Sequence, residues 1–166
     1  MIVQANSHLG FVCRDLDKSV KFYEEILGCK EKFSLYYGDM IPPTPEERAQ
    51  MPPEVLDRLE KRKDVRWIVY LEWMDGYFIE LFHEVDAHID NPYDPANYGY
   101  THFSFVVDDI HAFYQDFLDK GLEDIIDVTP QLNCDHTWAM WFHDPDGNRV
   151  EVHQYTGRSF ERIGRT

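Results

Sequence analysis

The sequence predicts an α+β fold built from two βαβββ modules with curved, mixed sheets, on the basis of two internal repeats and one pattern of strands. The first repeat joins residues 75–82 to 146–153, each reading Asp-Gly, two residues, a β-branched aliphatic residue, Glu and a second aliphatic residue. The second joins residues 7–12 to 101–106, each a hydroxyl residue, a His and a strand-like run. Three consecutive strand-like segments follow each helical pattern, which favours mostly antiparallel pairing with the helices on one face.

The first module is expected to span residues 1–83. Its helix is indicated by apolar residues that recur at helical spacing and by a glycine that follows them: Leu16, Val20, Tyr23, Leu27 and Gly28. An Asp-Gly pair between two strand-like runs is typical of a hairpin turn. The expected elements are a strand over 5–13, a helix over 16–27, and strands over 29–37, 65–73 and 77–83.

The first module also carries an insertion, which we place at residues 38–64. His8 and Glu80 are 72 residues apart, whereas the matching His102 and Glu151 are 49 apart, so the first module has an excess of 23 residues. The sequence therefore predicts one duplication followed by an insertion between two strands.

The insertion is expected to be helical. Residues 44–47 (Thr-Pro-Glu-Glu) resemble a helix start, with a hydroxyl cap, a proline in the first turn and a glutamate three residues after the cap. Pro52-Pro53 is expected to end that helix and to begin a second one, which runs to the basic residues 61–63. The sequence does not indicate what this excursion does.

The second module is expected over residues 100–155, after a linker over 84–99 that contains two prolines and several acids. Its helix is indicated by apolar residues at helical spacing and by the glycine that follows them: Ile110, Phe113, Phe117, Leu118 and Gly121. The expected elements are a strand over 100–107, a helix over 110–120, and strands over 126–132, 137–143 and 149–155. Residues 156–166 form a tail whose role the sequence leaves open.

Composition limits the classes of partner. The net charge of −15 and the pI near 4.7 argue against nucleic acid or an anionic membrane surface, which both require a basic footprint. A hydrophobic fraction of 43% supports a real core, and the apolar runs are of strand length. Three widely spaced cysteines without a C-x-x-C motif favour a reducing compartment, so we expect a cytoplasmic protein.

Four polar residues occupy matching positions in the two modules: His8 with Glu80, and His102 with Glu151. Because side chains alternate between the two faces of a strand, the side chain of each Glu is expected on one face and the aliphatic residues on either side of it on the other face. An unpaired carboxylate centred in an apolar strand is costly, so a cationic partner is expected. Two imidazoles and two carboxylates suit a divalent metal with positions left for water or substrate.

The duplicated pattern does not include the other histidines. A single His on a strand is more often exposed or locally paired than a metal ligand, and we assign no role to His83, His88, His111, His136 or His143. His153 is expected on the same face as Glu151, and its part in the pocket stays open. Residues 144–148 (Asp-Pro-Asp-Gly-Asn) form a turn by composition, which we expect to set the hairpin register that places Glu151.

These residues resemble the vicinal oxygen chelate superfamily, which includes glyoxalase I, methylmalonyl-CoA epimerase, extradiol dioxygenases, and fosfomycin- and bleomycin-resistance proteins. The resemblance covers nearly the whole chain except residues 38–64 and the tail. The segments that carry it are His8 with residues 15–19 and 22–23, the strand 79–81, residues 99–103, and residues 144–151.

The resemblance is greatest to glyoxalase I-like (lactoylglutathione lyase-like) proteins, and it implies one divalent ion held by His8, Glu80, His102 and Glu151. Epimerases of the methylmalonyl-CoA type usually have Gln where Glu80 stands, while extradiol dioxygenases and fosfomycin enzymes rely on two His and one Glu. Two carboxylates leave an ion of low net charge, which suits enediolate stabilisation better than oxygen activation. Nickel or zinc is expected first, with manganese, cobalt and iron as alternatives.

The implied activity is that of a metal-dependent lyase or isomerase that moves a proton on an α-hydroxycarbonyl or hemithioacetal. Glu151 is the expected base and Glu80 the second catalytic carboxylate, with roles that exchange if the substrate has the other handedness. Glutathione-dependent members commonly carry Arg where this chain has Val12 and Asn where it has Glu84. The resemblance therefore implies a small-molecule substrate and an activity that is not specific for glutathione, and the identity of the substrate stays open.

Two alternatives remain on the sequence alone: an extradiol-type dioxygenase, and a non-catalytic small-molecule binding protein of the bleomycin-resistance kind. The first would not need Glu80 for metal binding, and the second would contain no metal. The resemblance also predicts a homodimer, because members of the superfamily commonly pair modules within or between chains around the metal. Which of these two arrangements applies here is open.

Overall fold

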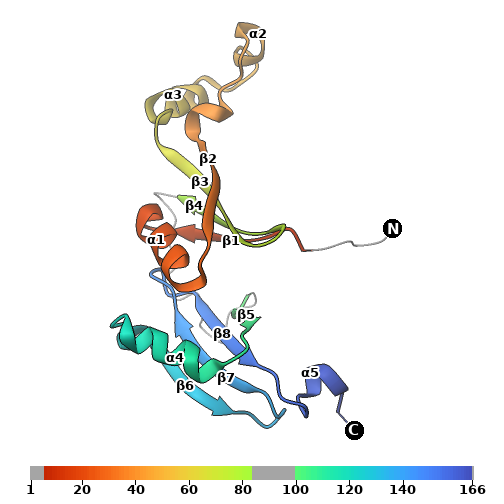
Figure 1. Ribbon diagram of the computed structural model, residues 1–166. Helices are drawn as coiled ribbons and strands as arrows, with labels where there is room; N and C mark the ends of the chain where they lie inside the picture. Colours follow the sequence, from red (N-terminus) through yellow and green to blue (C-terminus); the bar gives the residue numbers. More distant parts are fainter. Residues whose placement is uncertain (1–5, 84–99, 166) are drawn as a thin grey trace. The chain divides into compact units, whose positions relative to one another are not determined.

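The computed structural model describes residues 6–83 and 100–165, and the chain divides into two units, Met1–His88 and Ile89–Thr166. Each unit contains one four-stranded sheet (Figure 1). The predicted linker, 84–99, lies outside the described residues.

Unit 1 contains a mixed sheet in the order β1-β4-β3-β2. The first strand runs parallel to the last, and the two other pairings are antiparallel. The βαβββ order and the α+β class are confirmed, since two of the three pairings are antiparallel as expected. The elements are β1 (His8–Cys13), α1 (Leu16–Leu27), β2 (Lys30–Tyr36), β3 (Arg66–Met74) and β4 (Tyr77–His83).

Unit 2 repeats this topology, with the order β5-β8-β7-β6 and the same single parallel pairing. Its first strand is shorter than the expected 100–107, so His102 lies immediately before the strand. The elements are β5 (Phe103–Val106), α4 (Ile110–Asp119), a 3₁₀ turn η2 (Glu123–Ile125), β6 (Ile126–Leu132), β7 (Trp138–His143) and β8 (Arg149–Gln154).

An aspartate begins the main helix of each unit. Asp15 accepts a hydrogen bond from the Lys18 amide at 3.0 Å, and Asp109 accepts from the amides of His111 and Ala112 at 2.9 and 3.0 Å. Such caps satisfy amides that have no partner within the helix. Each helix packs on the three later strands of its own unit, as Figure 1 shows for α1 and α4.

The core of each unit lies on one face of its two central strands. On this face, four residues of each hairpin have no exposed surface: Val69, Leu71, Ile79 and Leu81 in unit 1, and Met140, Phe142, Val150 and Val152 in unit 2. Full burial of one such side chain stabilises the fold by about 1.5–3 kcal/mol. Because strand side chains alternate, this burial directs Glu80 and Glu151 to the other face of each sheet.

The expected turn at residues 144–148 connects β7 to β8. The Asp144 carboxylate is almost fully buried, and it accepts hydrogen bonds from the Asp146 amide at 2.9 Å and the Asn148 amide at 2.7 Å. Gly147 has φ +87°, a conformation that favours glycine. This turn sets the pairing of His143 with Arg149 and of Trp141 with Glu151, which confirms its predicted register role.

The insertion forms helical turns at the end of β2 and β3 (Figure 1). Its elements are η1 (Tyr37–Met40), α2 (Pro45–Arg48) and α3 (Pro53–Arg62). The predicted capping box is present, with Thr44 and Glu47 bonded reciprocally. The helix α2 ends at Arg48, earlier than the predicted limit. The amides of Gln50 and Met51 then donate to the Glu47 and Arg48 carbonyls at 3.1 Å, in tighter turns that lead to Pro52.

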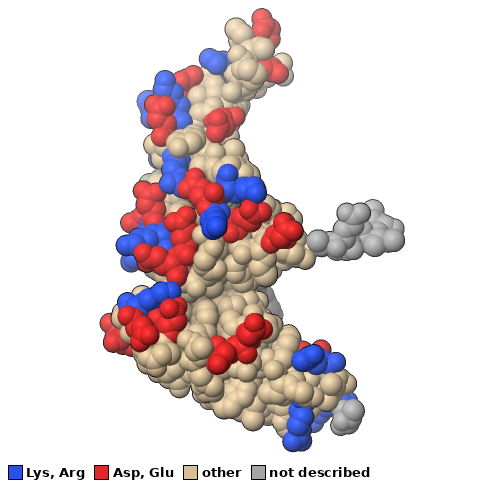
Figure 2. Space-filling model, in the orientation of Figure 1, with Lys and Arg blue, Asp and Glu red and all other residues tan. Residues whose placement is uncertain are grey.

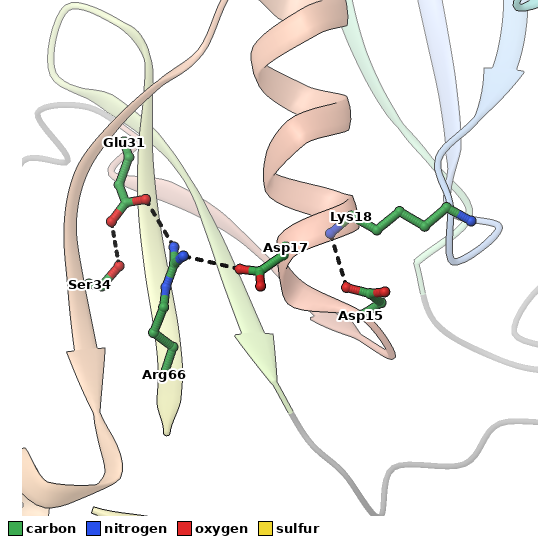
Figure 3. Close-up of polar contacts among 6 residues, drawn as sticks. All are labelled: Asp15, Asp17, Lys18, Glu31, Ser34 and Arg66. Carbon is green, nitrogen blue, oxygen red and sulfur yellow. Dashed lines mark hydrogen bonds and ion pairs between the residues drawn. The ribbon is translucent and has the colours of Figure 1, made fainter. Parts of the chain in front are cut away.

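Close packing holds the base of the insertion. The Gly38 amide donates to the Lys63 carbonyl at 3.0 Å, and a Cβ at Gly38 would lie only 2.8 Å from that oxygen. Arg66, just after the insertion, binds Asp17 of α1 at 3.1 Å and Glu31 of β2 at 2.9 Å (Figure 3). Partly exposed ion pairs of this kind contribute about 0–1 kcal/mol each, so the Arg66 network orients more than it stabilises.

The tail packs on the turn between β6 and β7. Thr156 Oγ1 and Ser159 Oγ donate to the His136 carbonyl at 2.8 and 3.1 Å, and the Phe160 amide donates to the Asp135 carbonyl at 3.0 Å. A short helix, α5 (Phe160–Ile163), follows. The tail is thus part of unit 2, which the sequence did not indicate.

Basic side chains on the surface are often paired with acids. Examples are Lys32 with Glu72 at 2.9 Å, Lys61 with Asp57 at 2.6 Å, and Lys120 with Asp116 at 2.6 Å. On the face drawn in Figure 2, red and blue side chains lie next to each other. Within residues 6–83 and 100–165, no helix combines the length and the apolar character needed to cross a membrane.

Candidate functional site

The parallel pairing of β1 with β4 brings the first predicted pair together. Gly10 lies opposite Glu80, and His8, two residues earlier, is on the same face of the strand. His8 Nε2 lies 3.3 Å from Glu80 Oε2. Glu80 is only 7% exposed, so the carboxylate is buried beside an imidazole. A Cβ at Gly10 would lie 3.6 Å from Glu80 Oε2, which places Gly10 directly against this pair.

Unit 2 reproduces the arrangement at the same register. Ser104 lies opposite Glu151, and His102 precedes Ser104 by two residues. His102 Nε2 is 3.4 Å from Glu151 Oε2, and Glu151 is 9% exposed. Thr101 Oγ1 lies 2.8 Å from His102 Nδ1, so the other ring nitrogen faces the carboxylate. The hydroxyl residue noted before each His therefore contacts the imidazole in this unit.

An aromatic residue lies opposite each glutamate on the neighbouring antiparallel strand. Tyr70 pairs with Glu80 and Trp141 pairs with Glu151. His8 contacts the Tyr70 ring edge-on at 5.9 Å between centroids, and His102 contacts the Trp141 ring in the same manner at 4.7 Å. Sequence reasoning missed both rings, although each stands ten residues before its glutamate.

Tyr70 also bonds to the carboxylate. Its hydroxyl donates a hydrogen bond to Glu80, and this bond, followed by burial and by the negative charge of Glu80, raises the pKa of Tyr70 to about 12. Tyr70 is therefore a neutral donor throughout the physiological range. Phe33 stacks on the Tyr70 ring at 4.4 Å between centroids, which fixes the plane of the phenol.

His153 is the additional residue that the structure brings to the second pair. Its Nε2 lies 3.1 Å from Glu151 Oε1, the oxygen that does not face His102. Its side chain is 13% exposed. At the matching position of unit 1, two residues after Glu80, the chain has Phe82. The sequence left the part of His153 open, and in the structure His153 contacts Glu151.

The remaining histidines contact other groups. His143 Nδ1 lies 3.0 Å from Asp127 Oδ1, His111 packs edge-on against Trp138 at 4.9 Å, and His136 packs against Phe160 at 5.3 Å. The His83 carbonyl accepts a hydrogen bond from the Tyr37 hydroxyl at 3.0 Å. His88 lies outside the described residues.

The donor chemistry of each pair fits a divalent cation. Each unit presents one imidazole nitrogen and one buried carboxylate oxygen at 3.3–3.4 Å from each other, and these are the donors that borderline divalent metals prefer. Among the described residues, no three His, Cys, Asp or Glu side chains form a group suited to holding a metal. The structure therefore shows two candidate ligand pairs. That both pairs bind the same ion stays a prediction.

Comparison with known proteins identifies the family. A family model described as the Glyoxalase/Bleomycin resistance protein/Dioxygenase superfamily matches residues 6–152, which include both His–Glu pairs. The chain belongs to this superfamily. The resemblance inferred from the sequence is thus confirmed. Superfamily members are typically metal-dependent enzymes acting on small molecules, and they are often dimeric.

Individual relatives of this superfamily member differ in activity. The metallothiol transferase FosB of Lysinibacillus sphaericus is 26% identical over 165 residues, covering 98% of this chain and 89% of the relative. A glyoxylase/bleomycin resistance protein/dioxygenase domain from Frankia sp. EAN1pec is 20% identical, with 93% of this chain and all of that chain covered at a TM-score of 0.63. Lactoylglutathione lyase from Agrobacterium tumefaciens is 18% identical, with 93% and 96% covered at 0.56. The two structural matches support the fold alone.

Proposed function

We propose that this superfamily member is a metal-dependent lyase or isomerase of the glyoxalase I kind, which transfers a proton on a chelated α-hydroxycarbonyl or hemithioacetal. One observation carries the proposal: both units bring a His and a buried Glu together at the same strand register. A histidine and a glutamate placed twice in this way are difficult to explain by sheet stability, since a buried carboxylate is costly without a strong partner.

Both pairs are needed for one ion. Metal sites in proteins commonly use three or four protein ligands, whereas each pair offers only two. We therefore assign one ion to His8, Glu80, His102 and Glu151, with nickel or zinc as the expected metal. The pairs join either within a chain or between two copies, and we expect a homodimer.

In this proposal the two carboxylates move the proton. A bound divalent ion would supply Lewis-acid polarisation of a substrate carbonyl or hydroxyl oxygen. Glu151 takes a proton from the adjacent carbon and returns it to the neighbouring carbon, while the hydroxyl proton passes to the former carbonyl oxygen; Glu80 is the second carboxylate. Both carboxylates are suited to proton transfer because Glu80 is 7% and Glu151 9% exposed, which limits competition from water. Substrate of the opposite handedness would exchange the two roles.

Thiol transfer is the second candidate function. It is favoured by the likeness to the metallothiol transferase FosB, which extends over 98% of this chain. Both candidates use a divalent ion and a small molecule. They differ in the bonds that change. The first moves a proton between carbons. The second forms a bond between a thiol sulfur and an electrophilic carbon, while that carbon releases its bond to a leaving atom and the thiol proton passes to that atom.

A thiol panel distinguishes the two candidates. Metal-loaded protein is mixed in D₂O with methylglyoxal and one thiol at a time, and products are followed by NMR. We expect conversion to a thioester with a thiol other than glutathione, and weak turnover with glutathione because Val12 and Glu84 replace residues that commonly hold it. Turnover with glutathione at a rate typical of dedicated enzymes would contradict the substrate argument. Thioether formation with an added electrophile, without thioester from any hemithioacetal, would support thiol transfer instead.

A further inference from the structure

Each candidate ligand carboxylate has a second polar partner besides its histidine. Glu80 accepts a hydrogen bond from the Tyr70 hydroxyl, and Glu151 Oε1 lies 3.1 Å from His153 Nε2. These partners reach the carboxylates from different places. Tyr70 lies opposite Glu80 on the neighbouring strand, whereas His153 lies two residues after Glu151 on the same strand and face.

The two units carry different residues at the two positions from which these partners come. The position opposite the glutamate is Tyr70 in unit 1 and Trp141 in unit 2. The position two residues after the glutamate is Phe82 in unit 1 and His153 in unit 2. In unit 1 the polar partner lies opposite the glutamate, and in unit 2 it lies two residues after the glutamate. The other of the two positions is Phe82 in unit 1 and Trp141 in unit 2. The second partner of the carboxylate therefore comes from a different position in each unit.

We propose that Tyr70 and His153 are positioning residues for metal binding, which hold Glu80 and Glu151 so that each carboxylate keeps an oxygen directed toward its histidine partner. This inference rests on the proposed metal centre. In unit 2 the division is explicit, because His153 takes Oε1 and leaves Oε2 beside His102 Nε2. A carboxylate that is already fixed loses less side-chain freedom when an ion binds.

The surroundings of both partners support a fixed orientation. The Tyr70 ring is stacked on Phe33 and contacted by the edge of His8, so the hydroxyl position is defined by two rings. His153 is 13% exposed and lies 6.2 Å from the Tyr155 ring centroid. Residues that orient metal ligands through hydrogen bonds typically change metal affinity by about 10–100-fold when removed.

Three substitutions test the inference. Tyr70→Phe removes only the hydroxyl and keeps the ring that contacts Phe33 and His8. His153→Phe copies the residue that unit 1 has at the matching position, and His153→Gln retains an N–H donor near the place of Nε2. Tyr77→Phe, at an exposed tyrosine of β4, and His111→Phe, at a histidine that packs on Trp138, are the matched controls.

Divalent-ion affinity of the full chain is measured by competition with a chelator, using Zn²⁺ and Co²⁺, together with the visible spectrum of the Co²⁺ form. We expect Tyr70→Phe and His153→Phe to weaken binding by about 10–100-fold and to alter the Co²⁺ spectrum. His153→Gln should restore most of the affinity, and both controls should match wild type. Circular dichroism of the metal-free proteins identifies any variant that fails to fold. If one variant fails to fold, the substitution in the other unit still tests the positioning role.

The outcomes separate this inference from the proposed function. If wild type binds the ion and both Phe variants bind it equally well with an unchanged Co²⁺ spectrum, the positioning role is wrong and the metal centre stands. If wild type itself takes up neither Zn²⁺ nor Co²⁺, the proposed centre fails and the positioning role fails with it. If His153→Gln binds as poorly as His153→Phe, the hydrogen bond to Glu151 is not what His153 provides.

Discussion

His8→Ala and His102→Ala should each weaken divalent-ion binding by more than about 100-fold. That value is the upper end of the effect expected when a residue that only orients a metal ligand is removed. Each substitution deletes a nitrogen donor and leaves a buried glutamate without its 3.3–3.4 Å partner. The measurement is chelator competition followed by elemental analysis of the dialysed protein. His111→Ala, whose histidine packs on Trp138, is the control and should retain wild-type affinity.

The two variants also show whether the pairs meet within one chain or between two. After subunit exchange, a mixture of His8→Ala and His102→Ala should regain part of the metal sites if one ion takes its ligands from two copies. It should regain none if both pairs belong to the same chain. Metal retained in full by both single variants would contradict a four-ligand centre in either form.

Glu151→Gln should lower proton exchange at the substrate carbon by about 10²-fold or more, the usual contribution of a general base. Glutamine keeps the size of the side chain and one acceptor oxygen but does not accept the substrate proton. Metal affinity should fall less than in His102→Ala, because a donor oxygen remains. Glu80→Gln should have a milder effect on turnover, if the two carboxylates differ as proposed.

This comparison requires metal-loaded protein, because loss of the ion would imitate loss of the base. Exchange of the carbon-bound hydrogen for deuterium, followed by NMR, measures the proton step directly. A larger loss in Glu80→Gln than in Glu151→Gln would reverse the assigned roles. Equal and small losses in both would contradict carboxylate catalysis.

The repeat explains how much of the fold the sequence predicted. Helix starts at Asp15, Thr44 and Asp109 depend on bonds to amides two or three residues away, so local composition was sufficient. The apolar residues beside Glu80 and Glu151 have no exposed surface, as strand alternation required. The candidate ligands could be proposed from the sequence because a costly feature, a glutamate in an apolar strand, occurs twice.

Cross-strand neighbours were harder to predict. The partnership of Tyr70 with Glu80 depends on the register of a hairpin that contains a bulge between Glu72 and Met74, and that of Trp141 on the five-residue turn held by Asp144. Neither register follows from periodicity alone. The docking of the tail on the His136 carbonyl depends on contacts between residues about 20 apart, for which no local pattern exists.

Metal content tests the central claim most directly. The protein is purified without chelator, and its metals are quantified by elemental analysis against the concentration of chain. We predict one divalent ion per chain in folded wild-type protein, lost in His8→Ala and His102→Ala alike. A folded wild-type protein that contains only traces of metal, and takes up no Ni²⁺, Zn²⁺, Mn²⁺, Co²⁺ or Fe²⁺ when supplied, would contradict the metal centre and favour a binding protein that needs no ion.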